Sequence, residues 1–197
     1  YISAMTDPFF EDWTAPFGAP PLDRIQPAHF PPAYDRALAE HAAEIAAIAE
    51  NRAPPSFDNL VLALEKSGQL LTRVEGVFHN LASSATSEAL QAIELEMAPR
   101  LSAHWSAITQ HPVLFARLDE LHAKRATLGL DAESLRLLER YHLDFVRAGA
   151  RHVPVDVGNP VPALRNMEFA VAEIRRRRFE RKAERRRHRR VRIVAVP

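Results

Sequence analysis

The fold class is decided by the segment Ser56-Phe-Asp-Asn-Leu-Val-Leu-Ala-Leu-Glu-Lys-Ser-Gly-Gln-Leu-Leu-Thr-Arg-Val-Glu-Gly-Val-Phe-His-Asn-Leu81. Its apolar residues recur at steps of three and four, the spacing that places side chains on one face of an α-helix. Ser56 is a suitable N-cap because its hydroxyl can accept a hydrogen bond from a free backbone N–H of the first turn. Gly68 is expected to bend or interrupt the helix. The segment therefore predicts helix on both sides of Gly68.

The same periodicity extends along the chain in both directions. It predicts helices over residues 31–50, 87–109 and 131–149, and a further helix that begins at Pro112 and is ended by Gly129. No convincing strand pattern and no repeat of fixed period occurs before residue 150. We therefore expect an all-α protein, a multi-helix array of about six helices.

Single residues mark the ends of these predicted helices. Ser87 and Asp131 are predicted N-caps, and Pro112 suits the first turn of a helix, where its missing N–H has no cost. Pro99 lies inside the 87–109 pattern and is a candidate kink, because proline removes a hydrogen bond from a helix interior.

Composition divides the chain into three parts. Residues 1–26 are rich in proline and predict an extended N-terminal arm. Residues 27–151 form the helical region. Residues 152–197 form a Pro/Val-rich linker and an Arg-rich tail, and the tail ends in strand-like residues. The arm is expected to lie across the helices through four aromatic anchors, namely Phe9, Phe10, Trp13 and Phe17.

The formal net charge of +1 conceals a strong asymmetry. Residues 1–152 hold 13 basic and 20 acidic residues, a charge of −7, whereas residues 153–197 hold 13 and 5, a charge of +8. An arginine run such as Arg175–Arg190 can neutralise phosphates and release counterions. An alternative function is therefore a helical interaction module whose tail binds nucleic acid or an acidic partner, although the only aromatic residues within the tail are Phe169 and Phe179.

Composition also excludes several classes of protein. The chain has no cysteine, so it forms neither disulfides nor thiolate metal sites. No apolar run approaches the roughly 20 residues that span a bilayer, and no secretory signal pattern is present. We expect a cytoplasmic protein without a membrane partner.

The histidines give only weak indications of chemistry. No histidine is followed by glutamate, so the His-Glu-x-x-His zinc motif, in which the glutamate activates a metal-bound water, is absent. Glu139 and His142 have the Glu-x-x-His spacing of di-iron bundles, but there is one copy where such a site needs two. His41 with Glu44 is a weaker example of the same spacing. A half-buried histidine beside a surface glutamate is the simpler interpretation of both pairs.

Serine and glycine motifs are equally uninformative. Ser83 and Ser84 lack the Gly-x-Ser-x-Gly context of a nucleophile elbow, and the six glycines form no phosphate-binding pattern. From the residues alone we assign no catalytic, cofactor-binding or metal-binding residue.

Whole phrases of the sequence, in contrast, resemble the start of bacterial peptidyl-dipeptidases (dipeptidyl carboxypeptidases) and of oligopeptidase A, which are thimet-oligopeptidase-like zinc metallopeptidases. These phrases are co-linear and together cover residues 7 to 151. They are Pro16-Phe-Gly-Ala-Pro-Pro-Leu-Asp-Arg-Ile25, Pro27-Ala-His-Phe30, Ala37-Leu-Ala-Glu-His-Ala-Ala-Glu-Ile-Ala-Ala-Ile48, Pro54-Pro-Ser-Phe-Asp-Asn59, Ala63-Leu-Glu-Lys-Ser-Gly68, Val77-Phe-His-Asn-Leu81, Glu96-Met-Ala-Pro99 and Leu137-Leu-Glu-Arg-Tyr-His-Leu-Asp-Phe-Val-Arg-Ala-Gly-Ala150.

The resemblance implies a helical, two-lobed enzyme with a deep channel, which hydrolyses short peptides and, in the peptidyl-dipeptidase branch, releases C-terminal dipeptides. Its zinc is held by a His-Glu-x-x-His helix and a later glutamate, far beyond the region matched here. This chain is accordingly expected to be an N-terminal scaffold and channel-wall portion, without zinc and non-catalytic alone. Its implied partner is the missing catalytic lobe, and short peptides are the implied substrates of the full-length enzyme.

The resemblance stops after Arg151. The family continues with helix of mixed charge, whereas this chain becomes rich in proline and valine and then in arginine. We interpret residues 152–197 as non-native to the family, through a frameshift or a chimeric junction near His152. Translation of the gene in the other reading frames tests this interpretation.

Overall fold

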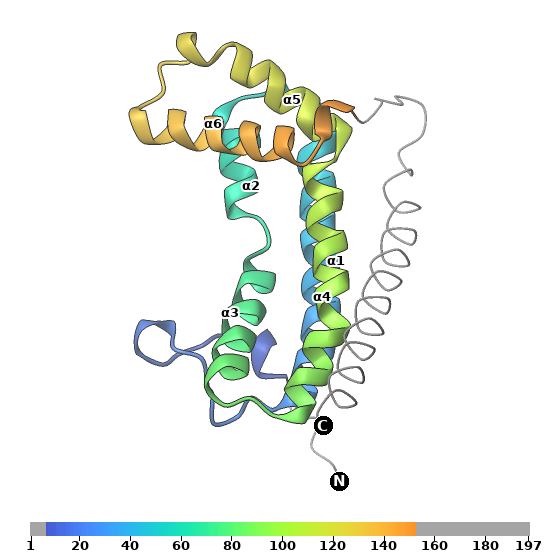
Figure 1. The fold of residues 1–197 in the computed structure, drawn as a ribbon. Helices are drawn as coiled ribbons and strands as arrows, with labels where there is room; N and C mark the ends of the chain where they lie inside the picture. Colours follow the sequence, from blue (N-terminus) through green and yellow to red (C-terminus); the bar gives the residue numbers. More distant parts are fainter. Residues whose placement is uncertain (1–6, 153–197) are drawn as a thin grey trace, which may run out of the picture.

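The computed structural model describes residues 7–152, and this range is built from helices and turns, with no β-strand. The all-α prediction is confirmed. Figure 1 shows the α-helices, which are α1 (Phe30–Glu50), α2 (Ala63–Lys66), α3 (Gln69–Ser84), α4 (Glu88–Thr109), α5 (Pro112–Ala123) and α6 (Ala132–Arg147). Shorter helical segments are the 3₁₀ turns Pro8–Phe10, Pro16–Gly18, Pro27–His29, Arg125–Thr127 and Ala150–His152, and the π-helical Phe57–Leu62.

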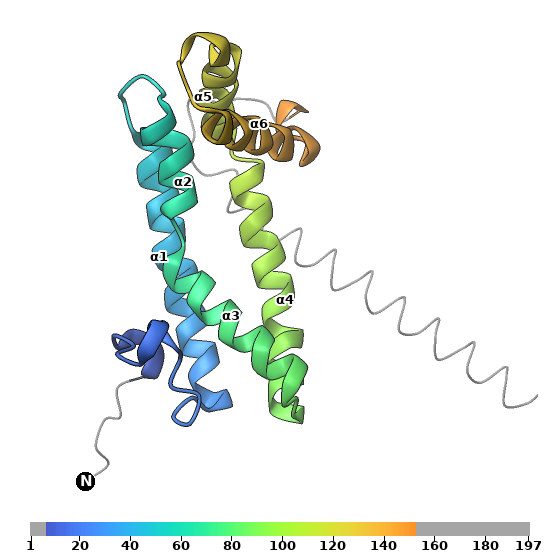
Figure 2. The same cartoon turned by 90° about the vertical axis from the view of Figure 1, so that its left-hand side faces the viewer.

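Helix α1 is the centre of the array. It packs against α3 on one side and α4 on another, while α5 and α6 pack together across one end (Figure 1). Helix α3 inclines from the end of α2 toward the start of α4, as the side view in Figure 2 shows. Helix α1 thus contacts α2, α3, α4 and α5, whereas α6 packs on α5 and on the π-helical segment Phe57–Leu62.

The predicted helix starts are correct. The hydroxyl of Ser56 accepts from the N–H of Asn59 at 3.1 Å, and that of Ser87 accepts from Leu90 at 3.3 Å. Asp131 caps α6 in the same way through Ser134. Each cap satisfies a backbone donor that an isolated first turn leaves free.

The two predicted interruptions behave differently. Gly68 adopts a left-handed backbone conformation (φ 69°) and separates α2 from α3, as expected. Pro99 lies inside α4, which continues through it to Thr109.

The predicted stop of α5 at Gly129 is wrong. The helix ends at Ala123, and a 3₁₀ turn follows at Arg125–Thr127. The guanidinium of Arg125 donates to the carbonyl of His122 at 3.0 Å, and the hydroxyl of Thr127 donates to the carbonyl of Lys124 at 2.9 Å. These bonds satisfy carbonyls at the helix end, and the chain turns before it reaches the glycine.

The arm follows the helices only in part. Phe9 is fully buried, and Phe10 and Trp13 pack partly against the same core, as predicted. Phe17 does not anchor the arm, because it is fully exposed at the tip of a loop. The loop turns away from the helices because Phe17 and Gly18 both have positive φ, at 61° and 65°.

Two apolar clusters form the interior. The arm-side cluster joins the arm to the first half of α1, to α3 and to the start of α4; its largest members are Phe9, Phe30, Tyr34, Leu71, Phe78 and Met97. The α5-side cluster joins the end of α1 to α2, α5 and α6; its members include Leu60, Leu64, Leu114, Leu118, Leu138 and Phe145. Helices α1 and α4 contribute to both clusters.

Several predictions fall outside the described range. They concern the residues from 153 onward, namely the linker, the basic run Arg175–Arg190 with its nucleic-acid affinity, and the strand-like end, and all remain predictions. None of the helices within residues 7–152 combines the length and the hydropathy that a membrane crossing requires.

Candidate functional site

A polar junction lies between the two apolar clusters, and it consists of His41, Ser67 and His104. His41 comes from α1, His104 from α4, and Ser67 from the break between α2 and α3. The Nε2 atom of His41 lies 3.1 Å from the Ser67 Oγ, and its Nδ1 atom lies 2.9 Å from the His104 Nε2. Both histidine side chains are buried, so three separate elements meet in one chain of hydrogen bonds.

The direction of these hydrogen bonds follows from their partners. The Ser67 hydroxyl donates its single proton to the carbonyl of Leu64 at 2.7 Å, so it accepts from the Nε2–H of His41. His41 then accepts at Nδ1 from the Nε2–H of His104. This arrangement resembles a serine–histidine pair, but it gives His41 no free lone pair toward the serine. The junction is therefore structural and not a nucleophile with its base.

Burial keeps both histidines neutral. Burial and, to a smaller extent, the neighbouring His41 lower the pKa of His104 to about 4. Burial also lowers the pKa of His41, against the opposing effect of Glu44. A charged imidazole is disfavoured where water cannot reach it. A second proton on His41 would also remove the Nδ1 lone pair that accepts the hydrogen bond from His104.

Glu44 and Gly68 complete the junction. The carboxylate of Glu44 accepts from the N–H of Gly68 at 2.7 Å, which satisfies one donor at the start of α3. The predicted pair of His41 with Glu44 thus lies at one place, but each residue has its own backbone or side-chain partner. No ligand-binding geometry results from their spacing.

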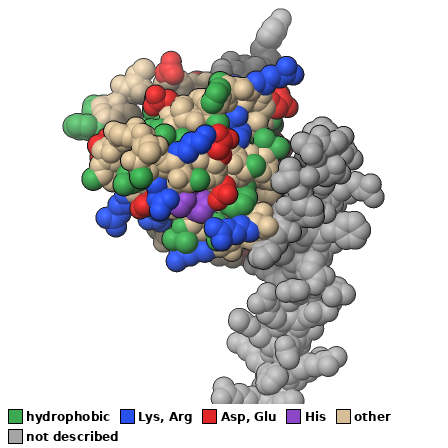
Figure 3. Space-filling view, turned by 90° about the horizontal axis from the view of Figure 1, so that it is seen from above, with side chains coloured by type: hydrophobic (Ala, Val, Ile, Leu, Met, Phe, Trp, Pro, Cys, Tyr) green, Lys and Arg blue, Asp and Glu red, His purple; other side chains and the backbone are tan. Residues whose placement is uncertain are grey.

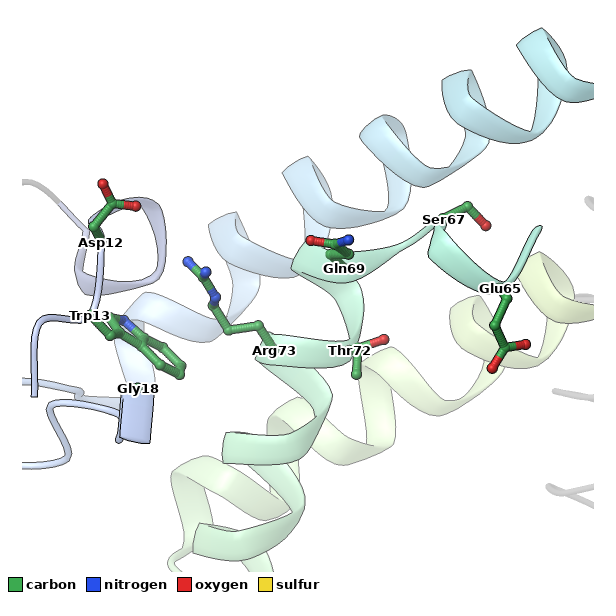
Figure 4. Close-up of a pocket in the computed structure, with 8 residues that line it drawn as sticks. All are labelled: Asp12, Trp13, Gly18, Glu65, Ser67, Gln69, Thr72 and Arg73. Carbon is green, nitrogen blue, oxygen red and sulfur yellow. The ribbon is translucent and has the colours of Figure 1, made fainter. Parts of the chain in front are cut away.

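A cleft of about 570 Å³ lies beside the junction, between the arm and the α2–α3 break (Figure 4). It is lined by Asp12, Trp13, Gly18, Glu65, Ser67, Gln69, Thr72 and Arg73. The guanidinium of Arg73 lies over the Trp13 ring, 4.8 Å from its centroid, and donates to the carbonyl of Phe9 at 3.3 Å. Arg73 therefore ties the arm to α3.

The lining of the cleft carries both signs of charge. Glu65 accepts a hydrogen bond from the hydroxyl of Tyr141 at 2.7 Å, and Ser67 is held in the polar junction. The cleft can form hydrogen bonds to a polar ligand, but it does not place a nucleophile beside a free base.

The structure separates the predicted pair Glu139 and His142. Glu139 forms an ion pair with Arg125 at 3.6 Å, whereas the Nε2 of His142 contacts a carboxylate oxygen of Asp119 at 2.8 Å. The ring of His122 stacks on that of His142 with centroids 3.9 Å apart. Among the described residues, this group is not arranged to hold a metal ion.

This end of the molecule is polar and mixed in charge. Viewed from above, histidine lies at the surface among basic and acidic side chains of the α5–α6 end (Figure 3). The pKa of His122 is lowered by partial burial and then by the neighbouring His142 and Arg125.

The remaining sequence candidates have local roles. The hydroxyls of Ser83 and Ser84 donate to carbonyls of the preceding turn of α3. Within residues 7–152 no group of three or more histidine or acidic side chains is arranged to hold a metal ion. The described residues thus do not match the ligand set that zinc requires.

Sequence reasoning missed the polar junction. In the sequence, His41 is considered only as a partner of Glu44, and His104 is not singled out. A histidine at a core position is a signal of a buried hydrogen-bond partner, but the partners lie 26 and 63 residues away from His41.

Comparison with known proteins finds similarity to two kinds of bacterial peptidase. No protein-family model matches the chain. Dipeptidyl carboxypeptidase of Escherichia coli K12 is 42% identical over 150 residues, which are 76% of this chain and 22% of that protein. The protein of the same name from Salmonella typhimurium is 40% identical over 146 residues, with 74% and 22% covered. Oligopeptidase A of Salmonella typhimurium is 26% identical over 145 residues, with 74% and 21% covered.

Over about three quarters of its length the chain is therefore similar to dipeptidyl carboxypeptidases and, more weakly, to oligopeptidase A, and the resemblance inferred from the sequence phrases is confirmed. The stronger similarity is to dipeptidyl carboxypeptidase. The chain spans about a fifth of the length of the relatives that it matches.

Proposed function

We propose that this chain is the N-terminal scaffold portion of a zinc metallopeptidase of the peptidyl-dipeptidase type. Its helices form part of the wall of a channel that admits short peptides and excludes folded proteins. The complete enzyme releases C-terminal dipeptides, and this chain alone does not cleave peptides.

The observation that carries this proposal is the identity of 42% over 150 residues with a protein of which it covers 22%. The internal structure of the chain supports it. The α-helices of 21 and 22 residues, α1 and α4, contribute to both apolar clusters, which suits a rigid wall. The hydrogen bonds of the polar junction connect helices, and they leave no free base beside Ser67.

The zinc ion of the proposed enzyme would be bound elsewhere in the polypeptide. It would activate water for attack on a peptide carbonyl. The residues of this chain would contribute shape and support to that reaction, and none of them is assigned a step in it.

A peptidase assay on the 197-residue chain tests the non-catalytic part of the proposal. A blocked tripeptide is incubated with the chain, with zinc added and with a chelator as control, and no hydrolysis is expected. Hydrolysis that the chelator abolishes would contradict the proposal.

A chimera tests the scaffold part. In it the matched residues of this chain replace the corresponding segment of the Escherichia coli dipeptidyl carboxypeptidase. The chimera is expected to fold and to hydrolyse the blocked tripeptide. An insoluble or inactive chimera would contradict the scaffold assignment.

A further inference from the structure

The arm carries one loop whose apolar side chain has no partner in the described part of the chain. Phe17 is as exposed as an isolated phenylalanine, with a relative accessibility of 108%, and Leu22 at the base of the loop is 46% exposed. The whole stretch 14–19 is exposed. In contrast, Phe9, Phe30 and Phe78 are buried in the arm-side cluster. Phe17 is thus an exception among the phenylalanines near the arm.

The loop is also held in an unfavourable backbone conformation. Phe17 has φ 61° and ψ 17°, a left-handed region that disfavours side chains with a Cβ atom. Gly18 also has a positive φ, and the N–H of Gly18 donates to the carbonyl of Ala15 at 3.0 Å. Phenylalanine therefore occupies a position that glycine would adopt at lower cost.

The base of the loop is fixed to the body. Arg24 forms an ion pair with Glu11 at 2.8 Å, and the indole N–H of Trp13 donates to the carbonyl of Pro8 at 2.9 Å. Arg73 holds the same segment from α3. The exposed ring is therefore presented by a fixed base, in a loop that stands out beside α3 (Figure 1).

We propose that the Phe17 loop is a docking element that inserts into an apolar pocket on the remainder of the peptidase polypeptide. This inference rests on the proposed function. The remainder of the polypeptide is chosen as the partner of the loop because nearly four fifths of the relatives' polypeptide has no counterpart in this chain.

Hydroxyl-radical footprinting measures the exposure of Phe17 directly. Its oxidation is compared in the 197-residue chain and in the Escherichia coli chimera, with the exposed Leu143 of α6 as internal reference. We expect Phe17 to be oxidised at least about ten times more slowly in the chimera. Equal oxidation in both proteins would overturn the docking proposal.

The substitution Phe17→Gly gives a second test, because it should change Tm in opposite directions in the isolated chain and in the chimera. In the isolated chain Phe17→Gly relieves the backbone strain and should raise Tm by about 2–4 °C. In the chimera it removes the docked ring and should lower Tm, whereas Phe17→Leu, which keeps an apolar side chain, should lower it less. A chimera that Phe17→Gly leaves as stable or makes more stable would overturn the proposal.

The outcomes separate the two proposals. A chimera that does not fold contradicts the proposed function and, with it, the docking that depends on it. A folded, active chimera with an exposed Phe17 contradicts docking alone. If oxidation of Phe17 in the isolated chain falls as protein concentration rises, and Phe17→Gly abolishes self-association, a second copy is the partner and the proposal is wrong.

Discussion

At Gly68 both the backbone conformation and the nearby side chain of His41 disfavour any residue with a Cβ atom. Gly68 has a positive φ, and a Cβ added to it would lie 2.9 Å from Cε1 and Nδ1 of His41. His41 cannot move aside, because Ser67 and His104 bind both of its ring nitrogens. Gly68→Ala therefore combines backbone strain with overpacking, and we expect a loss of about 2–4 kcal/mol in the free energy of unfolding.

Urea unfolding of the Gly68→Ala variant measures this loss. Gly76→Ala in α3 is the matched control, since a Cβ there has no atom within 4 Å. The control should gain about 0.5–1 kcal/mol, because alanine favours a helix interior over glycine. Similar effects at the two positions would contradict the proposed collision with His41.

His104 should make stability depend on pH. Its pKa is lowered to about 4 in the folded chain, against 6.5 for an exposed histidine. Between these values the unfolded chain binds a proton that the folded chain does not, so stability is complete above pH 6.5 and is lost as the pH falls toward 4. The lost free energy is about 3 kcal/mol for this group.

Unfolding free energies at pH 7.5 and pH 4.5 test this dependence. His104→Gln removes the titrating group while its amide can still donate to His41, so its stability should fall by about 2 kcal/mol less over this range than that of the parent chain. His79→Gln, at an exposed position of α3, is the control. An unchanged pH profile in His104→Gln would show that His104 is not the group responsible.

The hydrogen-bond partners in the polar junction could not be predicted from the sequence. The sequence offers Glu44 as the partner of His41 because the two are three residues apart. The real partners are brought in by the fold, from α4 and from the α2–α3 break. Spacing within one helix cannot contain that information.

At the scale of single elements, prediction succeeded where the physical cause was local. The N-caps at Ser56, Ser87 and Asp131 depend on contacts within three residues, and all three are formed. The end of α5 was misplaced because it depends on side-chain bonds from Arg125 and Thr127 to helix carbonyls. Gly129 is the more obvious helix stop in the sequence, but the 3₁₀ turn at Arg125–Thr127 ends the helix before it.

The Ser56 cap should have a measurable effect on the element that it begins. Its hydroxyl and the side chain of Asn59 exchange hydrogen bonds with each other's backbone N–H, at 3.1 and 2.9 Å. Ser56→Ala is expected to lower the free energy of unfolding by about 1 kcal/mol. Ser84→Ala is the control, because that hydroxyl donates only to the carbonyl of Asn80. A loss at Ser84 equal to that at Ser56 would argue against a capping role.

At the scale of the whole molecule, the arm shows how much depends on tertiary contacts. Its composition predicted an extended, anchored segment, and three of the four aromatic residues are in contact with the core. The exposure of Phe17 could not be predicted, because an exposed and a buried phenylalanine look alike in a sequence. Only the assembled core shows which rings it accommodates.

The two apolar clusters should unfold together, because α1 and α4 run through both. Trp105→Phe leaves Trp13 as the only tryptophan of the chain and as a fluorescent reporter of the arm-side cluster. In this background, Leu118→Ala removes a fully buried side chain from the α5-side cluster and should cost about 2–5 kcal/mol. The urea midpoint reported by Trp13 and that reported by far-ultraviolet circular dichroism should fall by the same amount. Leu143→Ala, at a position that is 44% exposed, should change either midpoint little. A Trp13 midpoint that stays in place while the dichroism transition divides into two would mean that the clusters unfold independently and that α1 and α4 do not couple them.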